Sequence, residues 1–111
     1  MTTQPIDSLN NPLPVLRLKK NGAHTIAAGA ITARNSSAFD SKTEVISLYS
    51  SVPVYVAFGG SDIEATSSDH YFPAEIYYDL AIGADSGVHY THMAVLRADS
   101  SDGTVYISEK E

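Results

Sequence analysis

Residues 52–58 read Val-Pro-Val-Tyr-Val-Ala-Phe, and they form the clearest strand pattern in the chain. β-Branched and aromatic side chains recur in this stretch, and such side chains fit the pleated, half-buried surface of a sheet. Residues 59–62, Gly-Gly-Ser-Asp, are typical of a turn and end the strand. The stretch therefore predicts a β-strand and favours an all-β fold.

Short segments of the same kind lie on both sides of this strand, separated by turns rich in Gly, Ser, Asp and Asn. By the same criteria, strands are expected at residues 15–20, 24–28, 30–33, 44–49, 52–58, 63–66, 75–82, 92–98 and 104–108. No window of eleven or more residues carries an apolar stripe at helical spacing. The spacing of about ten residues between segments predicts a single all-β domain with a β-sandwich or jelly-roll-like fold.

Two connections in this pattern are expected to be hairpin turns. Asn21-Gly22 follows the first segment, and this dipeptide is a strong hairpin signal. Residues 92–98 and 104–108 flank a polar loop at 99–103, so they are expected to pair as a closing hairpin.

The first fourteen residues have a different character from the rest. They hold three of the five prolines and show no hydrophobic period, and proline suits neither a helix interior nor a central strand. Residues 1–14 are therefore expected to be an extended N-terminal arm, and residues 15–111 to be the β-sandwich domain. The arm is expected to order on a partner, with its sparse apolar residues as anchors: Ile6, Leu9 and Leu13.

Composition excludes several classes of protein. The length of 111 residues fits one domain, and the absence of Cys excludes disulfides, thiol catalysis and Cys-ligated zinc. The chain contains no run of 18 apolar residues, and its N-terminal sequence lacks the features of a signal peptide. Neither a membrane span nor a secretion signal is expected.

Charge is unevenly distributed along the chain. Residues 36–111 carry twelve acids and three bases, whereas Arg17, Lys19 and Lys20 form a basic cluster near the start. An acidic body repels phosphate, so nucleic acid is not an expected partner. Two interpretations of the basic cluster stay open: a solvated strand edge, or a docking segment that meets an acidic neighbour during assembly.

No group of residues matches a known catalytic or metal-binding pattern. The four histidines are His24, His70, His89 and His92. Residues three apart on a strand, such as His89 and His92, face opposite sides and cannot share a metal ion. Asp99 and Asp102 beside Gly103 lack the third acid and the terminal Glu of a calcium loop, and no serine lies in a nucleophile elbow. The sequence therefore predicts no enzyme, no metal and no cofactor.

Seven Tyr and three Phe lie mostly in or beside the expected strands, where most are expected to fill the core or its rim. Tyrosine is also common at interfaces, because its ring buries area while its hydroxyl can still form a hydrogen bond. Tyr77 and Tyr78 are consecutive, so on a strand one faces the core and the other faces solvent. We expect Tyr71, Phe72 and one of Tyr77 and Tyr78 to contact a partner.

Between residues 43 and 108 the strands, turns and one proline-containing bend follow a specific order. The segments that define this order are Thr43–Tyr49, Val52–Gly59, Ala65–Asp69, Phe72–Glu75, His92–Arg97 and Gly103–Ile107. The order resembles the small all-β virion structural proteins of tailed bacteriophages over about 60% of the chain. One position departs from the family pattern, because Glu75 stands where members usually have Gly two residues after the proline.

The resemblance implies a non-enzymatic structural role on an assembled particle, as a capsid decoration (cement) protein or another head or tail accessory. It implies a location in the virion, assembled in the host cytoplasm, with the major capsid protein or another virion protein as partner. A symmetric homo-oligomer, with a homotrimer favoured, suits such a lattice because each added copy adds valency.

A second class of function stays open, a carbohydrate- or receptor-binding β-module of a tail fibre or spike. That role needs exposed aromatic platforms beside acidic or amide side chains. Tyr90 with Asp85 and His89 are the first candidates for such a site.

Overall fold

The computed structural model describes residues 16–83 and 88–111, and the chain forms strands and no helix in these two ranges. The strands are β1 (Leu18–Ala28), β2 (Ala33–Arg34), β3 (Val45–Ser50), β4 (Val54–Gly59), β5 (His70–Phe72), β6 (Tyr78–Ala81), β7 (His92–Arg97) and β8 (Gly103–Lys110). The all-β prediction is confirmed. A search of the same two ranges for a helix long and apolar enough to cross a membrane finds none. The predicted arm, with Ile6, Leu9 and Leu13, lies outside the described residues.

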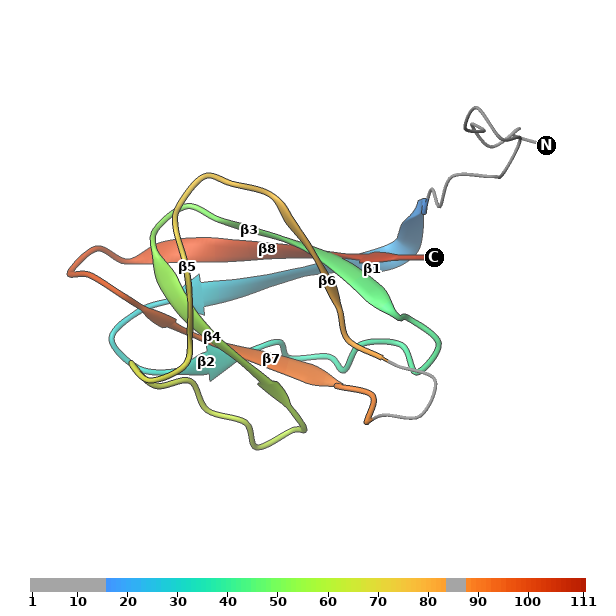
Figure 1. Ribbon diagram of the computed structural model, residues 1–111, viewed down its shortest axis with the longest axis horizontal. Helices are drawn as coiled ribbons and strands as arrows, with labels where there is room; N and C mark the ends of the chain where they lie inside the picture. Colours follow the sequence, from blue (N-terminus) through green and yellow to red (C-terminus); the bar gives the residue numbers. More distant parts are fainter. Residues whose placement is uncertain (1–15, 84–87) are drawn as a thin grey trace, which may run out of the picture.

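The strands form two antiparallel sheets of four strands each. One sheet has the order β1-β8-β3-β6 and the other has the order β2-β7-β4-β5. Every connection except β4 to β5 passes from one sheet to the other. Figure 1 shows the result as two layers, with β1, β3 and β8 in one and β2, β4 and β7 in the other. The arrangement is sandwich-like.

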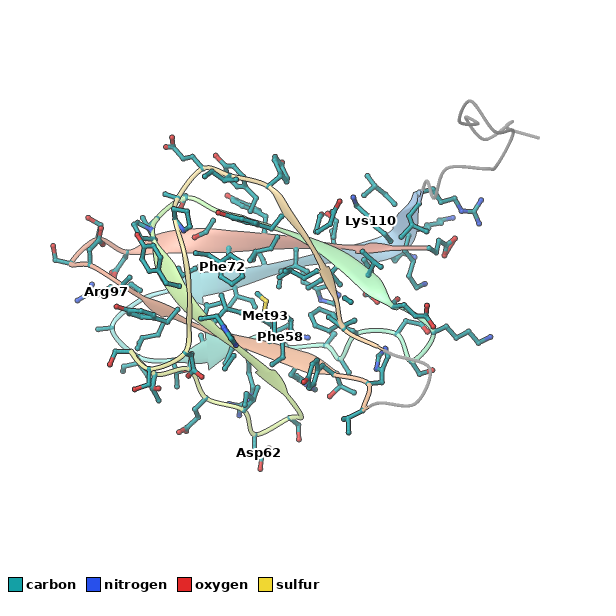
Figure 2. All side chains as sticks on the ribbon, in the orientation of Figure 1. Phe58, Asp62, Phe72, Met93, Arg97 and Lys110 are labelled. Carbon is teal, nitrogen blue, oxygen red and sulfur yellow. The ribbon has the colours of Figure 1, made fainter. Side chains whose placement is uncertain are left out.

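One hydrophobic core lies between the two sheets. Inward positions alternate along the strands, so Val54 and Val56 of β4 are fully buried while Tyr55 between them is not. The core is completed by residues of both sheets: Ile26, Ile46, Leu48, Met93, Val95, Val105 and Ile107. Figure 2 places Phe58, Phe72 and Met93 in this interior region. Each fully buried Val, Leu or Ile stabilises the fold by about 1.5–3 kcal/mol relative to exposure.

Part of the outer face of the β2-β7-β4-β5 sheet is covered by the chain itself, while Tyr71 on its edge strand β5 stays exposed. The segment after β4 packs Ile63 and Ala65 over Ala57 and Ala94 in a second small apolar cluster. The cover is held by hydrogen bonds: the Ala65 N–H donates to the Thr32 hydroxyl at 2.8 Å, and Arg34 donates to the Ile63 carbonyl at 3.1 Å. The outer face of the other sheet carries the exposed tyrosines Tyr77 and Tyr106.

The predicted hairpin at Asn21-Gly22 is wrong. β1 continues through this dipeptide to Ala28, and its pairing with β8 shifts register between Leu18 and Ala23. Asn21 adopts a left-handed backbone conformation, with φ of 63°, which Asn tolerates better than most residues. The dipeptide therefore makes an irregularity within one strand rather than a turn between two, because β8 pairs with β1 on both sides of it.

The predicted closing hairpin is also wrong. β7 lies between β2 and β4, and β8 lies between β1 and β3, so neither strand has a free edge to pair with the other. Residues 98–102 instead cross from one sheet to the other. At the start of the crossing, the Ala98 N–H donates to the Pro53 carbonyl at 2.9 Å.

Other differences concern short segments. Residues 63–66 are not a strand, because they lie over the outer face of a sheet rather than beside its edge. Residues 70–72 lie outside the predicted strands and form β5. Of the segment predicted at 30–33 only Ala33 is in a strand, β2, and the segment predicted at 75–82 shortens to β6. The second one shortens because Glu75 takes a left-handed conformation, with φ of 66°, which interrupts an extended strand.

Candidate functional site

Three tyrosines gather on the outer face of the β1-β8-β3-β6 sheet, and we call this surface the tyrosine face. Tyr49 of β3 lies directly opposite Tyr106 of β8, with ring centroids 6.3 Å apart. Tyr77, which precedes β6, lies on the other side of Tyr49 at 4.8 Å. Tyr77 is 74% exposed and Tyr106 is 49% exposed. The rings point outward because their strand neighbours Leu48, Val105 and Ile107 take the inward positions.

Polar side chains border the tyrosine face. The Lys110 ammonium group donates to the Asp79 carboxylate at 2.8 Å across the sheet. A shallow hollow of about 340 Å³ lies between this pair and the rings, lined by Leu18, Ser47, Tyr77, Tyr78, Asp79, Ser108 and Lys110. Figure 2 shows Lys110 at the end of the molecule opposite Arg97. The surface therefore combines exposed rings with hydroxyl, carboxylate and ammonium groups.

A second candidate surface is a cleft of about 620 Å³, which we call the edge cleft. It involves β5 and β6, which are the edge strands of the two different sheets. Its lining is Ala57, Phe58, Ile63, Glu64, Asp69, His70, Tyr71, Phe72, Leu80 and Tyr90. A volume between about 300 and 1,000 Å³ with a largely apolar lining and a few polar groups is typical of small-ligand sites.

The aromatic residues of the edge cleft are fixed by contacts with other rings. Phe58 and Tyr90 are stacked, with centroids 5.6 Å apart and planes at 28°. Phe72 meets the inward-facing Tyr78 edge to face at 4.9 Å. The stack leaves Tyr90 37% exposed, so one side of this ring pair borders the cleft and solvent.

The polar residues of the edge cleft are Glu64, Asp69 and His70. One carboxylate oxygen of Asp69 accepts hydrogen bonds from the Thr66 N–H at 2.7 Å and from the Thr66 hydroxyl at 3.2 Å, which fixes the position of the acid. Glu64 and His70 are exposed. No Lys or Arg is among the described residues that line the cleft, so its charge is negative.

The third arrangement is a buried hydrogen-bond network around Glu109 of β8. Glu109 is only 4% exposed, and one of its oxygens lies 2.8 Å from the His24 imidazole. The other oxygen accepts from the Thr43 hydroxyl at 2.7 Å and from the Asp40 N–H at 2.8 Å. His24 also meets Phe39 edge to face. Burial opposes ionisation of Glu109, but the hydrogen bonds from His24 and Thr43 outweigh it and hold its pKa below the ordinary value of 4.5.

This network is not arranged as a catalytic relay. In a Ser-His-Asp type triad the hydroxyl bonds to the imidazole, which in turn bonds to the acid. Here the Thr43 hydroxyl and the His24 imidazole both bond to Glu109, so the imidazole does not lie between the hydroxyl and the acid. The geometry instead satisfies a buried carboxylate and ties β1, β8 and the segment before β3 together.

Three other groups considered for metal binding, His89, His92 and Asp102, are engaged within the chain. His89 bonds to the Thr43 carbonyl at 2.6 Å, and His92 bonds to the Thr91 hydroxyl at 2.8 Å. Asp102 pairs with Arg97. In the part of the chain that the structure describes, no three His, Asp or Glu side chains are placed to hold a metal ion.

The predicted partner residues fall on different surfaces. Tyr71 and Phe72 line the edge cleft, whereas Tyr77 belongs to the tyrosine face and Tyr78 packs against the core. Tyr77 is exposed and Tyr78 faces the core, as the alternation of side chains along a strand predicts for consecutive residues.

The basic cluster lies where β1 begins. Arg17 pairs with Glu111 at 2.7 Å and Lys19 lies 3.5 Å from Asp40, while Lys20 is exposed. Asp85, named with Tyr90 and His89 for saccharide binding, lies outside the described residues. His89 is held by the Thr43 carbonyl, and Tyr90 is the member of that trio found in the edge cleft.

Sequence reasoning missed the buried pair of His24 and Glu109. A signal was present, because His24 shares the even-numbered inward positions of Ile26 and Ala28 in β1. Glu109 likewise shares the inward positions of Val105 and Ile107 in β8. An acid and a histidine on the apolar side of two strands indicate a buried polar pair.

Comparison with protein-family models, with curated proteins and with solved structures finds no match to this chain. The fold and the three arrangements above are therefore what supports a functional proposal. Of these, the tyrosine face and the edge cleft are accessible to a partner, and the Glu109 network is buried.

Proposed function

We propose that the protein is a non-enzymatic structural protein of a bacteriophage virion, and specifically a capsid decoration (cement) protein. Two lines of reasoning support this proposal: the order of segments between residues 43 and 108, which resembles such proteins, and the tyrosine face. The role requires attachment to a particle rather than chemistry, which agrees with the engaged state of the His24, His89 and His92 imidazoles.

The strand order supports a jelly-roll fold. Eight strands in two sheets of order β1-β8-β3-β6 and β2-β7-β4-β5, with nearly every connection crossing between the sheets, have the connectivity expected of a double-sheet jelly roll. That architecture recurs in viral structural proteins and also in lectin domains. Fold alone does not choose between these roles, so the choice rests on the surface.

The tyrosine face is the single observation that carries the proposal. The chain covers part of the outer face of one sheet, over Ala57 and Ala94, with its own apolar cluster, whereas the outer face of the other sheet leaves Tyr77 and Tyr106 exposed. Tyrosine is enriched at protein interfaces because its ring contributes contact area and its hydroxyl stays bonded. A sheet face with several exposed rings offers contact area over several strands, which suits a protein partner.

The partner in this proposal is the major capsid protein or another virion protein, and the protein acts as a symmetric homo-oligomer, with a homotrimer favoured. Repeated attachment sites make modest contacts sufficient, because linked copies bind with a high effective concentration. Exposed Lys20 provides a positive charge for an acidic neighbour, whereas Arg17 and Lys19 beside it are paired with Glu111 and Asp40. The location of the protein is then the virion.

The test mixes purified protein with expanded, undecorated capsids of the parent particle and measures co-sedimentation. The wild type is expected to sediment with the capsids. A double variant, Tyr77→Ser with Tyr106→Ser, is expected to bind at least about tenfold more weakly, because it removes two exposed rings from the contact. Light scattering on the free protein measures the oligomeric state in parallel.

A matched control is Tyr90→Ser, which changes a ring of the edge cleft and leaves the tyrosine face intact. This control is expected to sediment like the wild type. Absence of wild-type protein from the capsid pellet, or equal binding by the double variant, contradicts the proposal.

A further inference from the structure

We propose that the edge cleft is a binding site for a neutral saccharide. This inference concerns a surface separate from the tyrosine face and does not depend on the virion role. Its basis is the combination, in one cleft of about 620 Å³, of exposed aromatic rings with two carboxylate acceptors, of which Asp69 is fixed by hydrogen bonds. The cleft involves edge strands of both sheets, so a ligand would contact both layers of the fold.

The charge of the cleft lining disfavours anionic ligands. Glu64 and Asp69 are on the described lining, whereas Arg34 bonds to the Ile63 carbonyl and is not on it. A phosphate, sulfate or uronic acid would therefore meet two like charges at the lining. Asp69 is held in place by its two hydrogen bonds from Thr66. Such an acid is preorganised to accept hydrogen bonds from ligand hydroxyls at a small cost in conformational entropy.

The aromatic rings provide a platform for an apolar face. Tyr90 is stacked on Phe58 and keeps 37% of its surface exposed, and Tyr71 on β5 is 56% exposed. A pyranose ring presents one face of C–H bonds and a rim of hydroxyl groups. The rings can pack on the C–H face while Asp69, Glu64 and His70 bond to the rim.

The geometry favours a saccharide over an organic cation. A cage for a quaternary ammonium group needs several ring faces directed at one point. Here Phe58 and Tyr90 cover each other, and Phe72 is turned edge-on to Tyr78, so the cleft presents a platform rather than a box. A purely apolar ligand is disfavoured as well, because it would leave two carboxylates desolvated without partners.

The experiment titrates the full-length protein with cellohexaose, maltohexaose and chitohexaose as neutral probes and with a hyaluronan hexasaccharide as the anionic probe. Isothermal titration calorimetry measures the affinity. At least one neutral probe is expected to bind, and the anionic probe is expected to bind at least about tenfold more weakly. Choline is titrated as the cationic probe and is expected not to compete.

Two variants locate the site. Tyr90→Ala removes the platform and Glu64→Gln removes one acceptor charge from an exposed position, so both are expected to weaken binding of the neutral probe, the first by about tenfold or more. Tyr77→Ala on the tyrosine face is the matched control and is expected to bind the probe like the wild type.

Failure of every neutral probe to bind, preference for choline, or unchanged affinity in both cleft variants overturns the inference. Because the capsid experiment depends on Tyr77 and Tyr106 and this one on Tyr90 and Glu64, the failure of one proposal is distinguishable from the failure of the other.

Discussion

Glu109 shows how a single buried charge can be retained in a small β-domain. A buried carboxylate is costly unless hydrogen bonds satisfy it, and three groups do so here: His24, Thr43 and the Asp40 N–H. Gly22 makes room for this residue, because a Cβ at that position would lie 2.9 Å from the Cβ of Glu109. The space that Glu109 needs therefore explains why residue 22 is a glycine, although Asn21-Gly22 was predicted to be a turn.

Replacing Glu109 by Gln should destabilise the protein by about 3 kcal/mol at pH 7, because the substitution removes a buried carboxylate that accepts hydrogen bonds and turns an amide NH₂ toward donors, while keeping the side-chain volume. Urea denaturation measures the change in the free energy of unfolding. Glu44→Gln is the control. Glu44 is exposed and lies just before β3, so this change should alter the free energy of unfolding by less than about 0.5 kcal/mol.

The same variant should alter the dependence of stability on pH. The pKa of Glu109 is lowered in the folded protein, since its hydrogen bonds outweigh the effect of burial, so its contribution is fully present above pH 4.5 and is lost as pH falls through the folded-state pKa. The groups that face it are His24, Thr43 and Asp40, and Lys19 lies beside Asp40. Between pH 6 and pH 3 the wild type should therefore lose more stability than Glu109→Gln. Parallel pH profiles would contradict this.

Glu75 occupies a backbone conformation that suits glycine. Its φ of 66° lies in the left-handed region, and the turn is fixed by the Glu75 N–H, which donates to the Ser50 carbonyl at 2.8 Å. The departure from the family pattern noted in the sequence therefore falls on a residue under backbone strain. The strain is local, since the strand order around it is intact.

Glu75→Gly should stabilise the protein by about 1 kcal/mol, because glycine removes the steric cost of the left-handed conformation. Thermal denaturation measures the effect. Ala74→Gly is the matched control: Ala74 does not have a positive φ, so this change should lower stability by about 0.5–1 kcal/mol. A loss of stability in Glu75→Gly would mean that the exposed Glu side chain contributes more than the strain costs.

At the scale of elements, alternation of side chains was a better guide than turn signals. The strand at 52–58 was predicted from its own residues, because β-branched and aromatic side chains at alternating positions describe a strand wherever it pairs. Asn21-Gly22 and the loop at 99–103 were predicted as hairpins and are not. Local turn chemistry can indicate that the chain bends, but the partner of each strand depends on contacts between residues far apart in the sequence.

Gly103 begins β8 at the crowded end of the crossing from β7. A Cβ there would lie 2.6 Å from the Ser51 hydroxyl oxygen and 2.7 Å from two methyl groups of Val52. Gly103→Ala should therefore destabilise the protein by about 1–3 kcal/mol, because the β3–β4 connection has to move away. Gly29→Ala is the control, since its Cβ would meet only Asp102 at an ordinary 3.7 Å, and it should be neutral or slightly stabilising. Chemical denaturation of both variants measures the contrast; similar losses would refute it.

At the scale of the whole molecule, the sequence predicted that Tyr77 and Tyr78 face opposite sides of a strand. It did not predict which other residues lie beside them in the folded protein. The alternation of Tyr77 and Tyr78 follows from strand geometry alone. The tyrosine face, however, needs β3 and β8 to be neighbours so that Tyr49 meets Tyr106. The edge cleft likewise requires β5 and β6 to lie at the edges of different sheets. Both depend on a strand order that no local pattern contains.

The N-terminal arm, residues 1–14, stays a prediction, because it lies outside the residues that the structure describes. The hydrophobic core of the described chain is formed from Ile26 onward. Near the start of the described chain, the backbones of Arg17 and Glu111 exchange two hydrogen bonds. A variant that lacks residues 1–14 keeps all of these contacts, and its free energy of unfolding should therefore stay within about 0.5 kcal/mol of the full-length value.

The same truncation should impair attachment to the particle. The arm is expected to bind the particle through its apolar anchors, Ile6, Leu9 and Leu13. Ordering the arm costs about 1 kcal/mol or more of conformational entropy for each residue, and contacts with the particle must offset this cost. Removal of the arm takes these contacts away. Thermal denaturation and capsid co-sedimentation of the truncated protein measure the two effects together. A normal melting temperature with lost co-sedimentation supports a docking arm. Normal co-sedimentation refutes it, and failure to fold means that the arm belongs to the domain, because in that case its apolar residues stabilise the fold itself.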